Sequence, residues 1–230
     1  MKIKAQIPNT LTLLNLAFGV AGIIRVIDGH LLEGAIFVLI AAILDFFDGF
    51  VARLLQVQSP MGKELDSLAD VVSFGVLPGI ILFEMTEQVT DSVWLPFLTL
   101  IIPMLSAYRL AKFNLDTRQS DRFIGLPTPA NALLISTLPY FFQRFPNLTF
   151  LAESPYFLIS LAWGMGLLLI AELPLIALKF KDFSFTHNRY RFILIGLALV
   201  GILGFQLAGI PLIILTYIGL SILENFGGSA

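Results

Sequence analysis

Apolar runs long enough to cross a lipid bilayer recur along the whole chain, separated by short breaks that contain Gly, Pro or charged residues. A helix needs about 20 apolar residues to span the hydrocarbon core, where only helices and closed barrels satisfy every backbone hydrogen bond. The sequence therefore predicts an all-α polytopic membrane helix bundle that forms one domain over residues 1–230. We expect about eight spans, at 9–27, 32–55, 67–86, 93–113, 127–143, 155–178, 190–206 and 208–224.

Two local expectations follow from polar and proline residues near these spans. Pro8 and Asn9 resemble the start of a capped helix, so the first helix is expected to begin there. Glu172 falls inside the sixth predicted span, two residues before Pro174. Because a proline inside a helix removes a backbone hydrogen bond and kinks the helix, we expect a buried Glu172 that supports a bend.

Basic residues fall mostly on one side of this predicted topology. With the N-terminus in the cytoplasm, all but two of the fourteen Lys and Arg residues lie on the cytoplasmic side, the exceptions being Arg25 and Arg144. Cytoplasmic loops of membrane proteins are enriched in these residues. The pattern predicts a protein of the cytoplasmic (inner) membrane with its N-terminus inside the cell.

Four aspartates lie close together at the second and third predicted spans. They form the pattern Asp45-x2-Asp48-Gly49-x2-Ala52-Arg53-x8-Gly62-x3-Asp66-x3-Asp70. The first four positions share one helical face, and so do the last three. A short connection makes the two helices antiparallel neighbours whose acidic faces can meet. A single charge at the bilayer centre costs about 2.5–3.5 kcal/mol, so four carboxylates require a cation.

The ligand types restrict which cation this is. The chain has no Cys and only two His, which stand far apart at His30 and His187, so a zinc site of the usual kind is excluded. Carboxylates alone favour Mg²⁺ or Mn²⁺, which also bind substrate phosphates, and four of them can hold two ions. Arg53 adds a guanidinium suited to phosphate. The motif thus indicates a metal-dependent site for a phosphorylated ligand on the cytoplasmic side.

At these residues the sequence resembles the CDP-alcohol phosphatidyltransferase family, whose signature it matches at every fixed position. The resemblance implies a core of six membrane helices, a homodimer, and transfer of a phosphatidyl group from a CDP-linked lipid to an alcohol with release of CMP. It implies that Asp45, Asp48, Asp66 and Asp70 hold the metals and that Asp70 is the general base. The residues expected to contact CDP are Gly49, Ala52, Arg53, Gly62 and Asp66, to which we add Thr12 and Asn15.

Segments outside the motif narrow the acceptor alcohol. Residues 65–75, 8–15, 109–114 and 125–130 resemble the phosphatidylserine synthase branch, whose members use CDP-diacylglycerol and L-serine. Lys112 stands where many relatives carry Arg. Serine has a carboxylate, which requires a nearby cation. The candidates for serine binding are Arg109, Arg118, Arg122, Ser73 and Asn114.

Purely structural roles are also open for some of these candidates. Arg109 is equally explained as a membrane-flanking arginine that binds lipid headgroups, while Ser73 and Asn114 also fit hydrogen bonds between packed helices. At the level of the whole chain, the alternatives to serine transfer are a different acceptor, glycerol 3-phosphate or inositol phosphate, and a divalent-cation transporter. The last is disfavoured because the carboxylates gather at one membrane face.

Overall fold

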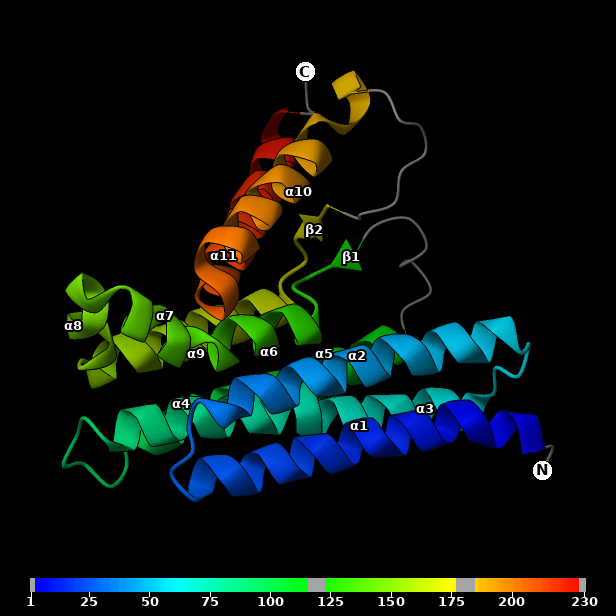
Figure 1. Ribbon diagram of the computed structural model, residues 1–230, viewed down its shortest axis with the longest axis horizontal. Coiled ribbons are helices and arrows are strands. Elements are labelled where there is room, and N and C mark those ends of the chain that lie inside the picture. The colour runs from blue at the N-terminus through cyan, green and yellow to red at the C-terminus, as the bar shows by residue number, and fades with distance from the viewer. Residues whose placement is uncertain (1–2, 116–122, 177–184, 228–230) are drawn as a thin grey trace.

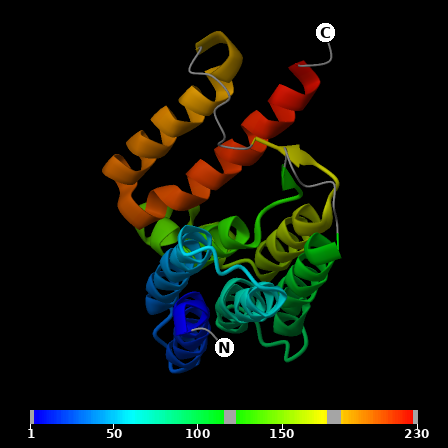
Figure 2. The ribbon, with the colours of Figure 1, turned by 90° about the vertical axis from the view of Figure 1, so that its right-hand side faces the viewer.

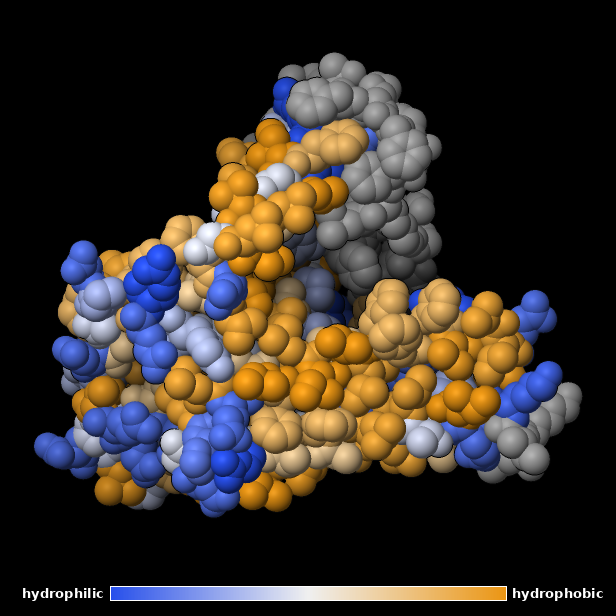
Figure 3. Space-filling model, viewed as in Figure 1, coloured by the Kyte–Doolittle hydropathy of each residue, from blue (hydrophilic) through white to orange (hydrophobic). Residues whose placement is uncertain are grey.

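The computed structural model describes residues 3–115, 123–176 and 185–227. Long helices lie side by side along the longest axis of the molecule, and a helical hairpin near the C-terminus rises steeply from them (Figure 1). Apolar side chains cover the middle of this bundle, while hydrophilic ones gather towards its two ends (Figure 3). The surface pattern and the apolar helices are those of an all-α integral membrane protein.

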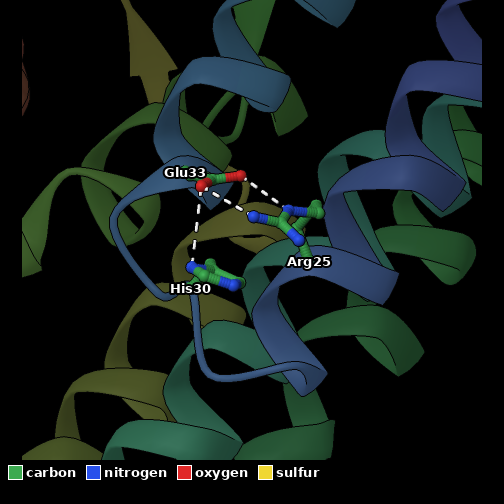
Figure 4. A network of polar contacts seen from close by, with 3 residues as sticks. All are labelled: Arg25, His30 and Glu33. Carbon is green, nitrogen blue, oxygen red and sulfur yellow. Dashed lines mark hydrogen bonds and ion pairs between the residues drawn. The ribbon is translucent and has the colours of Figure 1, made fainter.

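Helices α1 (Ile3–Ile27) and α2 (Glu33–Leu54) form an antiparallel hairpin. The turn between them contains Gly29 at φ 89°, a left-handed conformation that glycine adopts without steric cost. Arg25 donates two hydrogen bonds to Glu33, at 2.7 and 3.0 Å, and His30 lies 3.6 Å from the same carboxylate (Figure 4). This network fastens the end of the hairpin that lies away from the aspartate motif.

The first helix begins earlier than expected. It starts at Ile3 and contains Pro8, so the prediction that Pro8 and Asn9 begin the helix is wrong. Pro8 lies beyond the first turn of this helix and has no amide hydrogen to donate to the carbonyl four residues earlier. The hydroxyl of Thr10 also bonds back to the Gln6 carbonyl at 2.8 Å, as expected within a continuous helix.

The third apolar segment is the centre of the bundle. It runs without a break through α3 (Pro60–Asp70), the π-helical segment η1 (Val71–Val76) and α4 (Leu77–Glu87). Ser59 caps its start by accepting from the Gly62 amide at 3.0 Å. Phe74, Leu77 and Ile81 are fully buried. The helix begins seven residues before the predicted span at 67, because capping and Pro60 start a helix in a polar stretch that hydropathy alone does not include.

The next two segments are interrupted helices. The 3₁₀ turn η2 (Pro96–Leu100) leads into α5 (Ile101–Leu115). Helix α6 (Thr128–Ser136) is separated from α7 (Leu138–Arg144) at Thr137, whose hydroxyl bonds to the Leu133 carbonyl at 2.6 Å. Pro139, which has no amide hydrogen, follows this break.

Helix α9 (Pro155–Ile170) follows the short turns η3 (Pro146–Leu148) and α8 (Thr149–Ala152) and ends well before the predicted limit at 178. Two short strands then pair antiparallel, β1 (Phe123–Ile124) with β2 (Pro174–Leu175). Glu172 therefore lies outside the helix, is exposed, and accepts from Lys112 Nζ at 3.2 Å. The expectation of a buried, bend-supporting Glu172 is wrong, because the chain leaves the helix before Pro174 rather than kinking at it.

The C-terminal hairpin consists of α10 (Phe185–Phe205), the 3₁₀ turn η4 (Gln206–Gly209) and α11 (Ile210–Gly227). Figure 2 shows the two helices running antiparallel, and α11 packs against α6 of the main bundle. Within the described residues, four helical stretches are long and apolar enough to cross a membrane, or five if the bent pair Pro146–Ala152 and Pro155–Ile170 counts as one. The eight expected spans are not confirmed, because several segments are short or broken.

Candidate active site

Three of the four motif aspartates meet at one point. Asp45 and Asp48 come from α2 and Asp66 from α3, and one carboxylate oxygen of each lies within 4.8 Å of the other two. Helix α1 packs against both α2 and α3, so it joins the two acidic helices. Asp48 is buried, whereas Asp45 and Asp66 are half-buried. The two helical faces predicted from the spacing therefore face one another in the structure.

Asp70 lies deeper, at the junction of α3 and the π-helical segment. Its side chain is 7% exposed. Asn15 on α1 donates its Nδ2 to Asp70 Oδ1 at 3.4 Å. The π-helical segment starts at the next residue. Such segments are frequent at functional sites, where the wider turn changes the direction of the following side chains.

Helix α1 also holds the outer part of the cluster. The Thr12 hydroxyl donates to Asp48 Oδ2 at 2.6 Å. Thr12 and Asn15 are almost completely buried, at 3% and 0% exposure. Both were expected to contact CDP; Thr12 lines the pocket beside the carboxylates, whereas Asn15 does not, and their side chains bond to Asp48 and Asp70.

A pocket of about 630 Å³ opens beside the carboxylates. Its walls come from α1, α2, α3 and the loop between the last two. Residues named in the sequence motif line it together with others that the motif did not include: Pro8, Asn9, Thr12, Asp48, Gly49, Ala52, Arg53, Val57, Gln58, Ser59, Pro60, Gly62, Lys63 and Asp66. The volume is in the range of small-molecule sites, and carboxylates and cationic side chains share its wall.

Small residues give this pocket its room. A methyl group added at Gly49 would lie 3.4 Å from an Arg53 guanidinium nitrogen, and one added at Gly62 would lie 3.4 Å from the Asn9 side-chain oxygen. The glycines therefore leave the cationic end of Arg53 and the amide of Asn9 accessible beside the carboxylates.

The aspartate cluster fits a divalent ion. Two carboxylates at 4.8 Å repel by about 3 kcal/mol at an effective dielectric of about 20, and the cluster contains several such pairs. Asp66 Oδ1 is buried and has no hydrogen-bond partner within the described part of the chain. A divalent cation bound by these carboxylates would offset the repulsion and would give Asp66 Oδ1 a partner.

The residues expected to bind serine lie in different surroundings. Arg109 on α5 is buried, at 8% exposure, and interacts electrostatically with Asp70. The Ser73 hydroxyl donates to the Asn15 carbonyl at 3.0 Å, and the Asn114 amide donates to the Ser67 hydroxyl at 2.8 Å. Ser73 and Asn114 thus make helix-to-helix hydrogen bonds. Arg118 and Arg122 lie outside the described residues.

Sequence reasoning missed part of the pocket wall. Gln58, Ser59 and Lys63 were not named as ligand-binding residues, yet they line the pocket. They lie between Arg53 and Asp66, in or next to the connection between the two halves of the motif. That position was the feature of the sequence that could have indicated a role in ligand binding. The Lys63 Nζ donates to the Asn114 carbonyl at 3.0 Å and ties α3 to α5.

Comparison with known proteins places this site in a family. The model of the CDP-alcohol phosphatidyltransferase family matches residues 5–176, which include every residue of the aspartate cluster and the pocket. The chain belongs to the CDP-alcohol phosphatidyltransferase family. Members use divalent metal ions, in agreement with the all-carboxylate cluster of Asp45, Asp48 and Asp66.

Three relatives illustrate the likeness within the CDP-alcohol phosphatidyltransferases. The CDP-diacylglycerol--serine O-phosphatidyltransferase of Mycobacterium leprae is 34% identical over 74% of this chain and 57% of its own length. That of Bacillus subtilis is 32% identical over 58% of this chain and 75% of its own. The archaetidylserine synthase of Methanothermobacter thermautotrophicus is 36% identical over 57% of this chain and 56% of its own length. The match with the M. leprae protein thus covers little more than half of that relative's length.

Proposed function

We propose that this protein transfers the phosphatidyl group of CDP-diacylglycerol to the hydroxyl of L-serine, giving phosphatidylserine and CMP. The observation that carries the proposal is the cluster of Asp45, Asp48 and Asp66 beside a pocket walled by Gly49, Ala52 and Arg53. Carboxylates gathered at a pocket of about 630 Å³ suit a nucleotide diphosphate held through divalent ions. The names of the relatives from M. leprae and B. subtilis support serine as the acceptor.

The reaction needs the serine hydroxyl to lose its proton as its oxygen attacks phosphorus. The bond from the lipid phosphorus to the bridging oxygen then breaks, and CMP leaves with that oxygen. Asp70 would take the proton: it is buried beside the other carboxylates, and Asn15 orients one of its oxygens. Arg53 would hold phosphate oxygens at the open side of the pocket.

Asp45, Asp48, Asp66 and Asp70 would hold one or two Mg²⁺ or Mn²⁺ ions. When bound, such ions neutralise phosphate charge and stabilise the departing oxygen. The protein contributes fixed positions for the ligands, since the Thr12 hydroxyl and the Asn15 amide restrain Asp48 and Asp70. Thr12, which lines the pocket, is proposed to contact CDP as well as to orient Asp48, and Asn15 is proposed to support the site through Asp70.

The proposal includes the setting of the enzyme. The distribution of basic residues supports a location in the cytoplasmic membrane, with the N-terminus and the aspartates facing the cytoplasm. The family resemblance supports a homodimer, which a mass measurement of the protein in detergent would test.

The decisive experiment incubates purified protein with CDP-diacylglycerol, Mn²⁺ or Mg²⁺ and a panel of alcohols while CMP release is measured. We expect turnover with L-serine, no turnover in EDTA, and recovery when Mn²⁺ is added in excess. Asp70→Asn should reduce the rate about 10²–10⁴-fold, the usual contribution of a general base.

The other outcomes separate the alternatives. Turnover with glycerol 3-phosphate or inositol phosphate but not with serine would contradict the proposed acceptor and leave the reaction class intact. Mn²⁺ flux into liposomes that survives Asp70→Asn, without any CMP release by the unsubstituted protein, would favour a transporter.

A further inference from the structure

Three buried polar side chains on helices that contact the π-helical segment have no role in the site described above. They are Ser106 and Arg109 on α5 and Asn131 on α6. Ser106 and Asn131 are fully buried, and Arg109 is 8% exposed. Within residues 3–115, 123–176 and 185–227, the Ser106 hydroxyl, Arg109 Nε and both side-chain polar atoms of Asn131 have no hydrogen-bond partner. Buried polar groups are nearly always paired, so these atoms indicate a bound polar group.

The positions of these residues relate them to Asp70. Ser106 and Arg109 are three residues apart and share one face of α5. A methyl group at Gly75 of the π-helical segment would lie 3.0 Å from the Ser106 side chain, and α5, which carries both residues, packs against that segment. Helix α6, which carries Asn131, also packs against the π-helical segment. The unpaired groups thus come from two helices that both contact the segment beginning directly after Asp70.

This region is separate from the nucleotide pocket. The 630 Å³ pocket is walled by α1, α2, α3 and their connecting loop, and none of Ser106, Arg109 and Asn131 lines it. Asp70 does not line that pocket either. Asp70 therefore lies between the acidic motif, to which it belongs, and the π-helical segment that α5 and α6 contact.

The geometry points to Ser106 and Asn131 as acceptor-binding residues that, with Arg109, hold the zwitterionic part of serine; this rests on the proposed function. Asn131 offers an acceptor for an ammonium group and donors for a carboxylate, while Arg109 Nε is a charged donor for the same carboxylate. The Ser106 hydroxyl can accept or donate. One cation among the three residues matches a group with a single carboxylate better than a dianionic phosphate.

The test measures serine kinetics at saturating CDP-diacylglycerol in Asn131→Leu and Ser106→Ala. We expect KM for serine to rise at least about tenfold, because each substitution leaves polar groups of serine unpaired, while KM for CDP-diacylglycerol changes less than about twofold. Serine should raise the unfolding temperature of the unsubstituted protein and fail to do so in Asn131→Leu. The variants should not unfold earlier in the absence of serine, since they remove unpaired buried groups.

Matched controls are buried hydroxyls that already bond within their own helix or turn. They are Ser136 on α6, whose hydroxyl donates to the Leu133 carbonyl at 3.4 Å, and Thr99, which donates to the Pro96 carbonyl at 2.7 Å. Ser136→Ala and Thr99→Val should leave KM for serine unchanged. If leucine at position 131 lowers the unfolding temperature, Asn131→Ala, which removes the amide without adding a charge, should raise KM for serine by the same factor.

The two proposals fail in different ways. An unsubstituted protein that uses serine, with variants whose KM for serine is normal, overturns the acceptor-binding role and leaves the proposed function standing. An unsubstituted protein that accepts only phosphorylated alcohols overturns the proposed function, and the zwitterion site with it.

Discussion

At the scale of single residues, Thr12 connects the first helix to the metal-binding face of the second. Its hydroxyl donates to Asp48 Oδ2 at 2.6 Å within a buried environment. Groups that orient metal ligands typically contribute 10–100-fold to metal affinity or activity. We therefore expect Thr12→Val to weaken Mn²⁺ binding, measured by titration calorimetry, by about 10–100-fold. Thr10→Val is the control, because the Thr10 hydroxyl bonds to the carbonyl of Gln6 in its own helix. Equal Mn²⁺ affinity in both variants would contradict this role.

A second residue-scale prediction concerns Glu172. Its carboxylate pairs with Lys112 at 3.2 Å, with both side chains substantially exposed. Exposed ion pairs contribute between about 0 and 1 kcal/mol. Glu172→Gln should therefore change the free energy of unfolding, measured with denaturant in detergent, by less than about 1 kcal/mol. A decrease of several kcal/mol in the free energy of unfolding would contradict this prediction and would indicate that Glu172 is a structural carboxylate.

At the scale of helices, the close approach of α1 to the π-helical segment sets the position of Asp70. A methyl group at Gly19 would overlap the Ser73 hydroxyl and lie 2.9 Å from the Ser73 backbone. Because the backbone cannot move aside locally, Gly19→Ala should destabilise the protein by about 1–3 kcal/mol and lower activity as well. Gly164→Ala on α9 is the control, since a methyl group there meets nothing within 4 Å. Thermal unfolding in detergent measures both; indistinguishable unfolding temperatures would refute the tight contact.

At the scale of the whole molecule, the proposed orientation is accessible to labelling because the chain contains no cysteine. Lys4 lies near the start of α1, and Asp91 lies in the connection after α4, at the opposite end of the bundle. In intact cells, a membrane-impermeant maleimide should label Asp91→Cys and should label Lys4→Cys only after permeabilisation. The reverse pattern would place the aspartate cluster outside the cell.

Much of the helical framework was predictable. The second predicted span, 32–55, agrees closely with α2 (Glu33–Leu54), because a uniformly apolar run of the right length has few other options. The ends of other helices could not be predicted from hydropathy, and α3 and α9 are examples. Ser59 and Pro60 start a helix in a polar stretch, while α9 ends at Ile170 although apolar residues continue. The Ser59 cap decides where α3 begins, and the pairing of β2 with β1 accompanies the end of α9. A hydropathy profile contains neither of these interactions.

The sequence alone determined that the chain spans membranes and that its aspartates occupy two helical faces, since both follow from local composition and the period of a helix. Only the tertiary structure decided that α1 joins those faces through Thr12 and Asn15, and that Ser106 and Asn131 are buried without partners in the described chain. Such contacts join residues far apart in sequence, and the packing of whole helices against one another sets their distances.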